Sequence, residues 1–272
     1  MKKTSISDML PYVDFCKSVM NDETGELLKT FRTNPDYDLV VPGSRPGEQV
    51  EPFVPIIRDR YPEILEHLGV FVKNQGVFGG PVTHEFDIGT FDVPMVLHIY
   101  YLAIARAAFG PLDGMRICEI GPGAGLFFKV LTDISKDVKY TFVDLEAPLY
   151  IVRKYVEYLG REDMVDGYLP CHTVLSDGFE CEEFDLVTSD CAFNELDGDV
   201  QDVYIEKIFN KSKRGRIACY SADWQKGEVV PKKTADIYDA ITHKDKVIIY
   251  DGFEDVSPDH KNVPTIYWGR QE

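Results

Sequence analysis

The sequence predicts an α/β fold in which helices cover both faces of a doubly wound, seven-stranded, mostly parallel sheet. Two observations lead to this prediction. From about residue 113 onward, short apolar runs of strand type alternate with stretches of helical periodicity, and a glycine-rich turn follows the first of these runs. Repeated strand–helix pairs form parallel sheets because each helix carries the chain back over one face. Residues 1–112 show no such alternation, so we expect a mostly helical N-terminal cap there and an α/β domain over 113–272.

The composition fits one large domain or a domain with a cap, with 272 residues of which 44% are hydrophobic and 28% charged. A formal net charge of −17 repels phosphate backbones and so argues against a nucleic-acid partner. No apolar run is long enough to span a bilayer, which argues against a membrane partner. The six cysteines form no Cys-x-x-Cys pair, so a zinc site is not expected and a reducing, cytoplasmic location is favoured.

The expected cap begins with a helix over about 9–20, where apolar residues share one helical face. Proline and glycine are frequent over 33–55, which predicts a loop. Residues 56–68 show partial helical spacing, and the glycine-rich residues 75–89 are expected to form an ordered loop or flap. A strong helix over 91–109 carries a proline in its first turn and ends at a Gly-Pro pair.

The α/β elements follow in order. Strands are expected over 116–120, 139–143, 165–169, 184–189, 216–220, 246–250 and 265–269, with helices over 124–134, 148–159, 200–210 and 234–242. Only a loop, 251–264, separates the last two strands, which predicts that the last strand runs antiparallel near one edge of the sheet.

The glycine turn after the first strand is the most informative stretch. Gly121, Gly123 and Gly125 alternate with other residues, and Glu119 stands two residues before the first of them. Glycine is required in such a turn because it adopts positive φ and lets a ligand approach the backbone closely. A dinucleotide fingerprint would place its third glycine where Leu126 stands, so the spacing disfavours a nicotinamide oxidoreductase.

The stretch Glu119-Ile120-Gly121-Pro122-Gly123-Ala124-Gly125 resembles motif I of class I S-adenosylmethionine (SAM) methyltransferases, whose Rossmann-like sheet has an antiparallel last strand. This resemblance implies SAM as the cofactor. It also implies that Gly121, Pro122, Gly123 and Gly125 pass its methionine end while Glu119 helps to hold its ammonium group. The alternative is a loop that only turns the chain.

Asp144 follows the second expected strand, about twenty residues after the glycine turn. A carboxylate at this point of a doubly wound sheet can accept both hydroxyl hydrogens of a ribose. The adjacent Leu145 would then pack on the adenine. Asp144 could instead only cap the next helix.

The stretch from Phe184 to Leu196 resembles a methyltransferase group described as sugar O-methyltransferases, with similarity over about residues 88–220. This chain departs from the group at Asp190, where asparagine is common, and at Asn194, where serine is common. The resemblance places Ser189 and Asp190 in the cleft beside the sulfonium. It implies a small-molecule acceptor, with the hydroxyl of a carbohydrate favoured.

Methylation of a hydroxyl requires an aligned acceptor and a base that removes its proton. Glu195 is the first candidate base because it follows the fourth strand at the cleft rim, and His98 and His84 come next. Each could instead have a structural role. In a second possible mechanism, Asp190 and Asp223 would hold Mg²⁺, which would activate the acceptor hydroxyl. The favoured interpretation is that these are two solvated acids, and no metal ligand is assigned.

Two other functions remain open at this point. One is a methyltransferase acting on an acid or a phenol, and the other is a SAM-binding protein without catalysis. An enzyme would consume SAM in the presence of an acceptor, whereas a binding protein would not. Assembly into a homo-oligomer is also left open.

Overall fold

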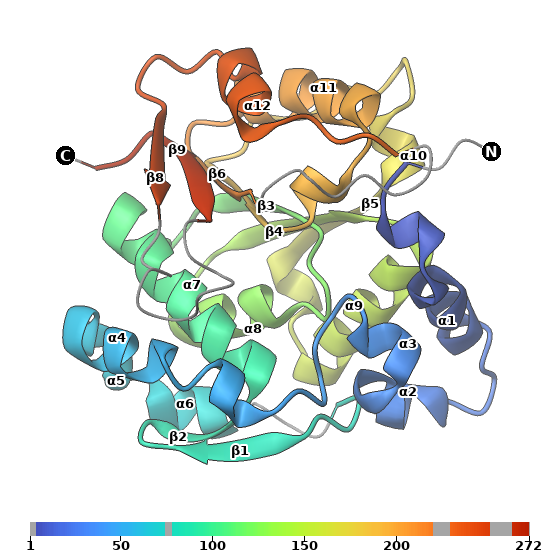
Figure 1. Ribbon diagram of the computed structural model, residues 1–272, viewed down its shortest axis with the longest axis vertical. Helices are drawn as coiled ribbons and strands as arrows, with labels where there is room; N and C mark the ends of the chain where they lie inside the picture. Colours follow the sequence, from blue (N-terminus) through green and yellow to red (C-terminus); the bar gives the residue numbers. More distant parts are fainter. Residues whose placement is uncertain (1–3, 74–77, 220–228, 251–262, 272) are drawn as a thin grey trace.

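The computed structural model describes residues 4–73, 78–219, 229–250 and 263–271 (Figure 1). A seven-stranded sheet in the order β5-β4-β3-β6-β7-β9-β8 forms its centre. All neighbouring strands are parallel except β9, which runs antiparallel to both β7 and β8. The predicted sheet and its antiparallel last strand are therefore confirmed. The strands are β3 (Arg116–Ile120), β4 (Lys139–Asp144), β5 (Val165–Pro170), β6 (Leu186–Asp190), β7 (Gly215–Ala218), β8 (Val247–Tyr250) and β9 (Pro264–Trp268).

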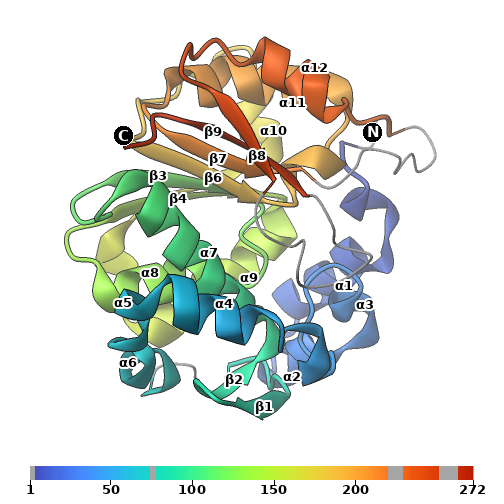
Figure 2. The same cartoon turned by 60° about the vertical axis from the view of Figure 1, so that its left-hand side comes forward.

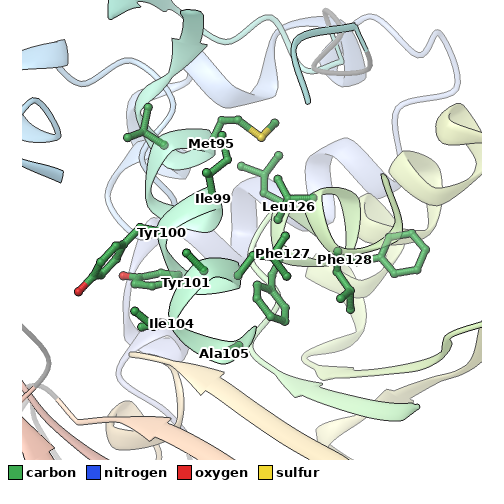
Figure 3. Packing of buried hydrophobic residues seen from close by; sticks show 14 of the residues in the cluster. Met95, Ile99, Tyr100, Tyr101, Ile104, Ala105, Leu126, Phe127 and Phe128 are labelled. Carbon is green, nitrogen blue, oxygen red and sulfur yellow. The ribbon is translucent and has the colours of Figure 1, made fainter. Parts of the chain in front are cut away.

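Helices cover both faces of this sheet (Figures 1 and 2). One face packs against α7 (Val93–Phe109), α8 (Leu126–Ile134) and α9 (Glu146–Leu159), and the other against α10 (Cys171–Val174), α11 (Gly198–Lys207) and α12 (Thr234–Ala240). The sheet separates two hydrophobic cores, the first on the side of α7, α8 and α9 and the second on the side of α10, α11 and α12. Successive strand residues enter opposite cores, so Ile117 lies in the first and Cys118 in the second. Ile99 of α7 and Leu126 of α8 contribute to the first core (Figure 3).

None of the helices in the described ranges combines the length and the apolar character needed to cross a bilayer.

The N-terminal residues form an outer layer over α7, α8 and α9 (Figure 2). The layer contains α1 (Pro11–Met20), α2 (Leu27–Thr30), α3 (Pro35–Asp38), α4 (Phe53–Arg60), α5 (Pro62–Leu65), α6 (Leu68–Lys73) and a hairpin of β1 (Thr83–Phe86) and β2 (Gly89–Asp92).

Two local predictions about this layer were wrong. The expected flap contains the β1–β2 hairpin, and the expected loop over 33–55 contains α3 and the start of α4. The partly helical character expected over 56–68 is confirmed by α4 and α5, and Pro62 begins α5. Elements of four residues carry too few positions for a periodic pattern. The domain boundary at residue 112 stays a prediction, and α7 shares one hydrophobic core with α8 and β3.

A buried ion pair fixes this outer layer to α7. The two guanidinium NH₂ groups of Arg32 donate to the two carboxylate oxygens of Asp92 at 3.0 and 3.1 Å, with both side chains at most 3% exposed. Asp92 also caps α7 by accepting from the Met95 amide. Removing one partner of a buried pair leaves an uncompensated charge.

We therefore expect Asp92→Ala to lower the free energy of unfolding by about 3–5 kcal/mol in urea titrations. The matched control is Asp14→Ala on α1, where the ion pair with Lys17 is largely exposed and a much smaller loss is expected. Equal losses in the two variants would contradict the structural role of the buried pair.

Candidate functional site

The chain reverses its direction of winding at β3. It passes from β3 through β4 to β5 on one side of the sheet, and then crosses to β6 on the other side of β3. In open α/β sheets, ligands bind at such a switch point, outside the carboxyl ends of the strands. The segment Glu119–Gly125 leaves β3 at this point, while Asp144 ends β4 and Asp190 ends β6. The candidate site lies along this edge.

The three glycines of the turn adopt left-handed backbone conformations, which other residues adopt only with strain. Gly121, Gly123 and Gly125 have φ of 71°, 57° and 79°, and Gly125 precedes the first residue of α8. The Gly121 amide donates to the Val143 carbonyl at 2.9 Å, which ties the turn to β4. A Cβ on Gly121 would overlap the Cβ of Ala192 in the loop after β6. The turn after β3 and the loop after β6 therefore approach one another closely because this residue has no side chain.

We expect Gly121→Ala to lower the free energy of unfolding by at least about 2 kcal/mol, because it adds both left-handed strain and overpacking. Adding Ala192→Gly should recover the overpacking part and leave about 1–2 kcal/mol of strain. Urea titrations of the single and double variants measure both contributions. A double variant no more stable than Gly121→Ala would show that the two loops are not in contact.

Glu119 is buried at the end of β3. The Tyr140 hydroxyl donates to its Oε2 at 2.8 Å. Burial raises the pKa of Glu119 to about 8 against the opposing effect of Tyr140, and the charges of Asp190 and Asp144 raise it further. A cationic group bound beside this carboxylate would be stabilised by it.

Asp144 lies at the carboxyl end of β4, where its Oδ1 accepts from the Leu145 amide at 2.7 Å. Burial raises its pKa to about 7, and the charges of Glu195 and Asp8 add to this rise. Glu119 and Asp144 thus stand on adjacent strands, on either side of the glycine turn, in an environment that favours a ligand with hydrogen-bond donors or positive charge.

Ser189 and Asp190 differ in what they offer a ligand. The Ser189 hydroxyl is buried, donates to the Ile120 carbonyl at 2.9 Å and accepts from the Phe193 amide at 3.0 Å, so it joins β6 to β3 instead of facing the cleft. One oxygen of Asp190 bonds to the buried guanidinium of Arg216. Its other oxygen, Oδ2, is buried and has no partner within the described residues.

His98 lies on α7 and is held in one tautomer. Its Nδ1 is 2.6 Å from the Pro94 carbonyl oxygen, which can only accept, so Nδ1 carries the proton and Nε2 keeps a lone pair. Burial lowers the pKa of His98, with the Pro94 bond opposing. The His98 ring centroid is 5.6 Å from that of Tyr101, whose ring is 5.0 Å from the Arg216 guanidinium. His98 and the Asp190–Arg216 pair therefore flank Tyr101.

The other two candidate bases are engaged differently. Glu195 lies in a 3-10 turn, Phe193–Glu195, and its Oε2 accepts from the Ser7 hydroxyl at 2.9 Å. The N-terminal segment holds this turn through the Ile6 amide, which donates to the Glu195 carbonyl at 2.9 Å. His84 lies in β1, with its Nε2 3.1 Å from the Arg45 carbonyl oxygen, on a hairpin set apart from the sheet (Figure 1). Both histidines are held in one tautomer by a backbone carbonyl, and His98 is the one that also lies beside Tyr101 and the Asp190–Arg216 pair.

A metal site has little support from the donor groups. The Arg216 guanidinium already forms an ion pair with Asp190, and Asp223 lies outside the described residues. Across residues 4–73, 78–219, 229–250 and 263–271, no three His, Cys, Asp or Glu side chains are grouped to hold a metal ion.

Several residues at this edge were not predicted from the sequence, namely Arg32, Arg216 and the segment from Thr4 to Asp8. Arg216 had a usable signal, because an arginine within the apolar run that ends at Cys219 is out of place in a buried strand. Ser7 had none, since it meets Glu195 across 188 residues of sequence.

No protein-family model and no curated protein matches this sequence. Among solved structures, the chain is similar to the mitomycin 7-O-methyltransferase MmcR, with 12% identity and a TM-score of 0.42 over 64% of this chain and 56% of that one. It is also similar to the [4+2]-cyclase SpnF, with 11% identity and a TM-score of 0.45 over 58% and 62% of the two chains. A SAM-dependent methyltransferase from Aquifex aeolicus shares 14% identity and a TM-score of 0.41 over 57% and 80%. The chain thus spans less than two thirds of the length of the first two of these proteins.

Proposed function

We propose that this protein is a SAM-dependent methyltransferase that methylates a hydroxyl of a sugar or of a sugar-bearing small molecule. One observation carries the proposal: Glu119 and Asp144 end adjacent strands at the switch point of the sheet, on either side of a glycine turn in left-handed conformations. The strand order with an antiparallel β9 is the arrangement that the motif I resemblance implies.

The residues of this edge suit each part of SAM. Asp144 would accept the ribose hydroxyls, Leu145 would pack on the adenine and Glu119 would stabilise the ammonium group. Carboxylates along the edge also complement the positive sulfonium, which supplies a methyl group already activated for transfer.

His98 is the proposed base. Its Nε2 lone pair is fixed by the Nδ1 bond to Pro94, and its lowered pKa keeps the imidazole neutral near pH 7. His98 would hold the acceptor hydroxyl and take its proton as the methyl group is transferred. A base is needed for a hydroxyl acceptor and not for a carboxylate, so this arrangement supports an alcohol.

The sugar acceptor is supported by the resemblance of residues 184–196 to sugar O-methyltransferases. It is tested by measuring S-adenosylhomocysteine (SAH) formation from SAM with free sugars, sugar nucleotides, phenols and carboxylic acids. We expect turnover with a hydroxyl of a sugar, lowered at least about a hundredfold in the His98→Asn variant. Turnover with phenols or acids alone would overturn the sugar assignment, and SAM binding without turnover of any acceptor would favour a non-catalytic role.

A further inference from the structure

Three buried hydrogen-bonding groups lie beside the glycine turn without a partner among the residues that the structure describes. They are Nε of Arg32 and the hydroxyls of Tyr37 and Tyr155, and each of these side chains is almost wholly buried. We call these three residues the Arg32 cluster. Buried polar groups in folded proteins are nearly always hydrogen-bonded, so three such groups together indicate a polar ligand.

The two tyrosines of the Arg32 cluster are linked through shared aromatic neighbours, one of which, Phe31, precedes Arg32 in the sequence. The ring centroid of Phe31 lies 4.8 Å from that of Tyr37 and 5.5 Å from that of Phe78. The Phe78 ring stacks on Tyr155, with the two centroids 5.1 Å apart. Burial raises the pKa of both tyrosines, and the Arg32 guanidinium opposes the rise in each. The charge of one guanidinium therefore acts on both tyrosines.

The Arg32 cluster also adjoins the candidate site. A Cβ on Gly125 would lie 3.5 Å from the Tyr155 ring, and a Cβ on Gly123 would lie 3.4 Å from Val41. The Val41 amide in turn donates to the Tyr37 carbonyl at 3.0 Å. The cluster therefore borders the same turn that Asp144 and Glu119 flank.

The chemistry of the cluster selects its ligand. One N–H and two hydroxyls can all donate to a group that accepts several hydrogen bonds, which a carboxylate does. The charge of Arg32 is already balanced by Asp92, and the neighbouring edge carries Glu119 and Asp144. A free anion bound there would disfavour the ionised forms of these two carboxyl groups further, whereas a carboxylate on a molecule that also carries positive groups would not.

We propose that the Arg32 cluster binds the α-carboxylate of the methionine part of SAM, an inference that rests on the proposed function. Nothing in motif I assigns these residues, because they come from the N-terminal layer and from α9.

Calorimetric titrations with SAH and with 5′-methylthioadenosine test this inference, because the second compound keeps the nucleoside and the sulfur but lacks the amino-acid group. Tyr37→Phe and Tyr155→Phe remove only the unpartnered hydroxyls, and Tyr158→Phe on the exposed side of α9 is the matched control. We expect each test variant to weaken SAH binding about tenfold and to leave the affinity for 5′-methylthioadenosine within about twofold of wild type. The control should change neither affinity.

Equal weakening of both compounds, or of neither, would overturn the carboxylate assignment. If one test variant does not fold, the other carries the test, and thermal unfolding identifies such a variant. Failure of the cofactor assignment on which the inference rests is seen separately, because the wild-type protein would then bind neither compound.

Discussion

Asp144→Asn is expected to weaken SAH binding at least about a hundredfold. A carboxylate that accepts two ribose hydroxyls makes charge-assisted hydrogen bonds, each worth about 1.5–3 kcal/mol. The amide keeps one oxygen to accept from the Leu145 amide but cannot accept two hydroxyls with a full negative charge. Calorimetric titration at pH 8, where the Asp144 carboxyl with its pKa of about 7 is ionised, measures the loss.

The same substitution is expected to stabilise the unliganded protein. The pKa of Asp144 is about 7 in the folded protein and close to the ordinary 3.8 when unfolded, so the folded state binds the proton more tightly. Folding is therefore disfavoured progressively as the pH rises from about 4 to 7. Asparagine has no such dependence, so the melting temperature of the variant should exceed that of wild type more at pH 8 than at pH 5.

Asp163→Asn, on the exposed turn before β5, is the matched control for both measurements and should change neither. An Asp144→Asn protein that keeps wild-type SAH affinity would exclude Asp144 as a ribose ligand. A loss of stability at pH 8 would contradict burial of the carboxyl as the cause of its raised pKa.

His98→Asn is expected to lower kcat by about 10²–10⁴-fold, the usual contribution of a general base. The asparagine amide can still donate toward the Pro94 carbonyl, so the local structure of α7 is kept while the basic nitrogen is removed. KM for SAM should stay close to the wild-type value. Steady-state kinetics with an accepted sugar at pH 8 measure the two constants separately.

The pH dependence of kcat gives an independent test of His98. A base must be neutral, so wild-type activity should fall as the pH drops through the pKa of His98, which burial places below its ordinary value of 6.5. This acidic limb should be absent from the residual activity of His98→Asn. His67→Asn is the matched histidine control, and an equal loss of kcat in that variant would argue against a specific role for His98.

The sheet could be predicted from the sequence because each buried strand is an apolar run that ends at charged or turn residues. The first strand was expected over 116–120 and is found at Arg116–Ile120. The β1–β2 hairpin was missed, since its four-residue strands lie largely at the surface and show little contrast between faces.

The site could be predicted only where its residues follow strand ends. Glu119, the glycines and Asp144 are identified by their positions along the chain, and the structure brings them to one edge. The sequence favours Glu195 as the base, whereas the ranking that we propose rests on the position of His98 and on the bond from Ser7 to Glu195, which leave no local pattern in the sequence. The pairing of Arg32 with Asp92, 60 residues apart, likewise leaves no local pattern in the sequence.

Calorimetric titration of the purified protein with SAH, with NAD as comparator, tests the assignment of the cofactor most directly. We expect micromolar binding of SAH and none of NAD, because the turn of Gly121, Gly123 and Gly125 lacks the third glycine of a dinucleotide site. Binding of NAD in preference to SAH, or of neither compound, would contradict the cofactor assigned to the edge between Glu119 and Asp144.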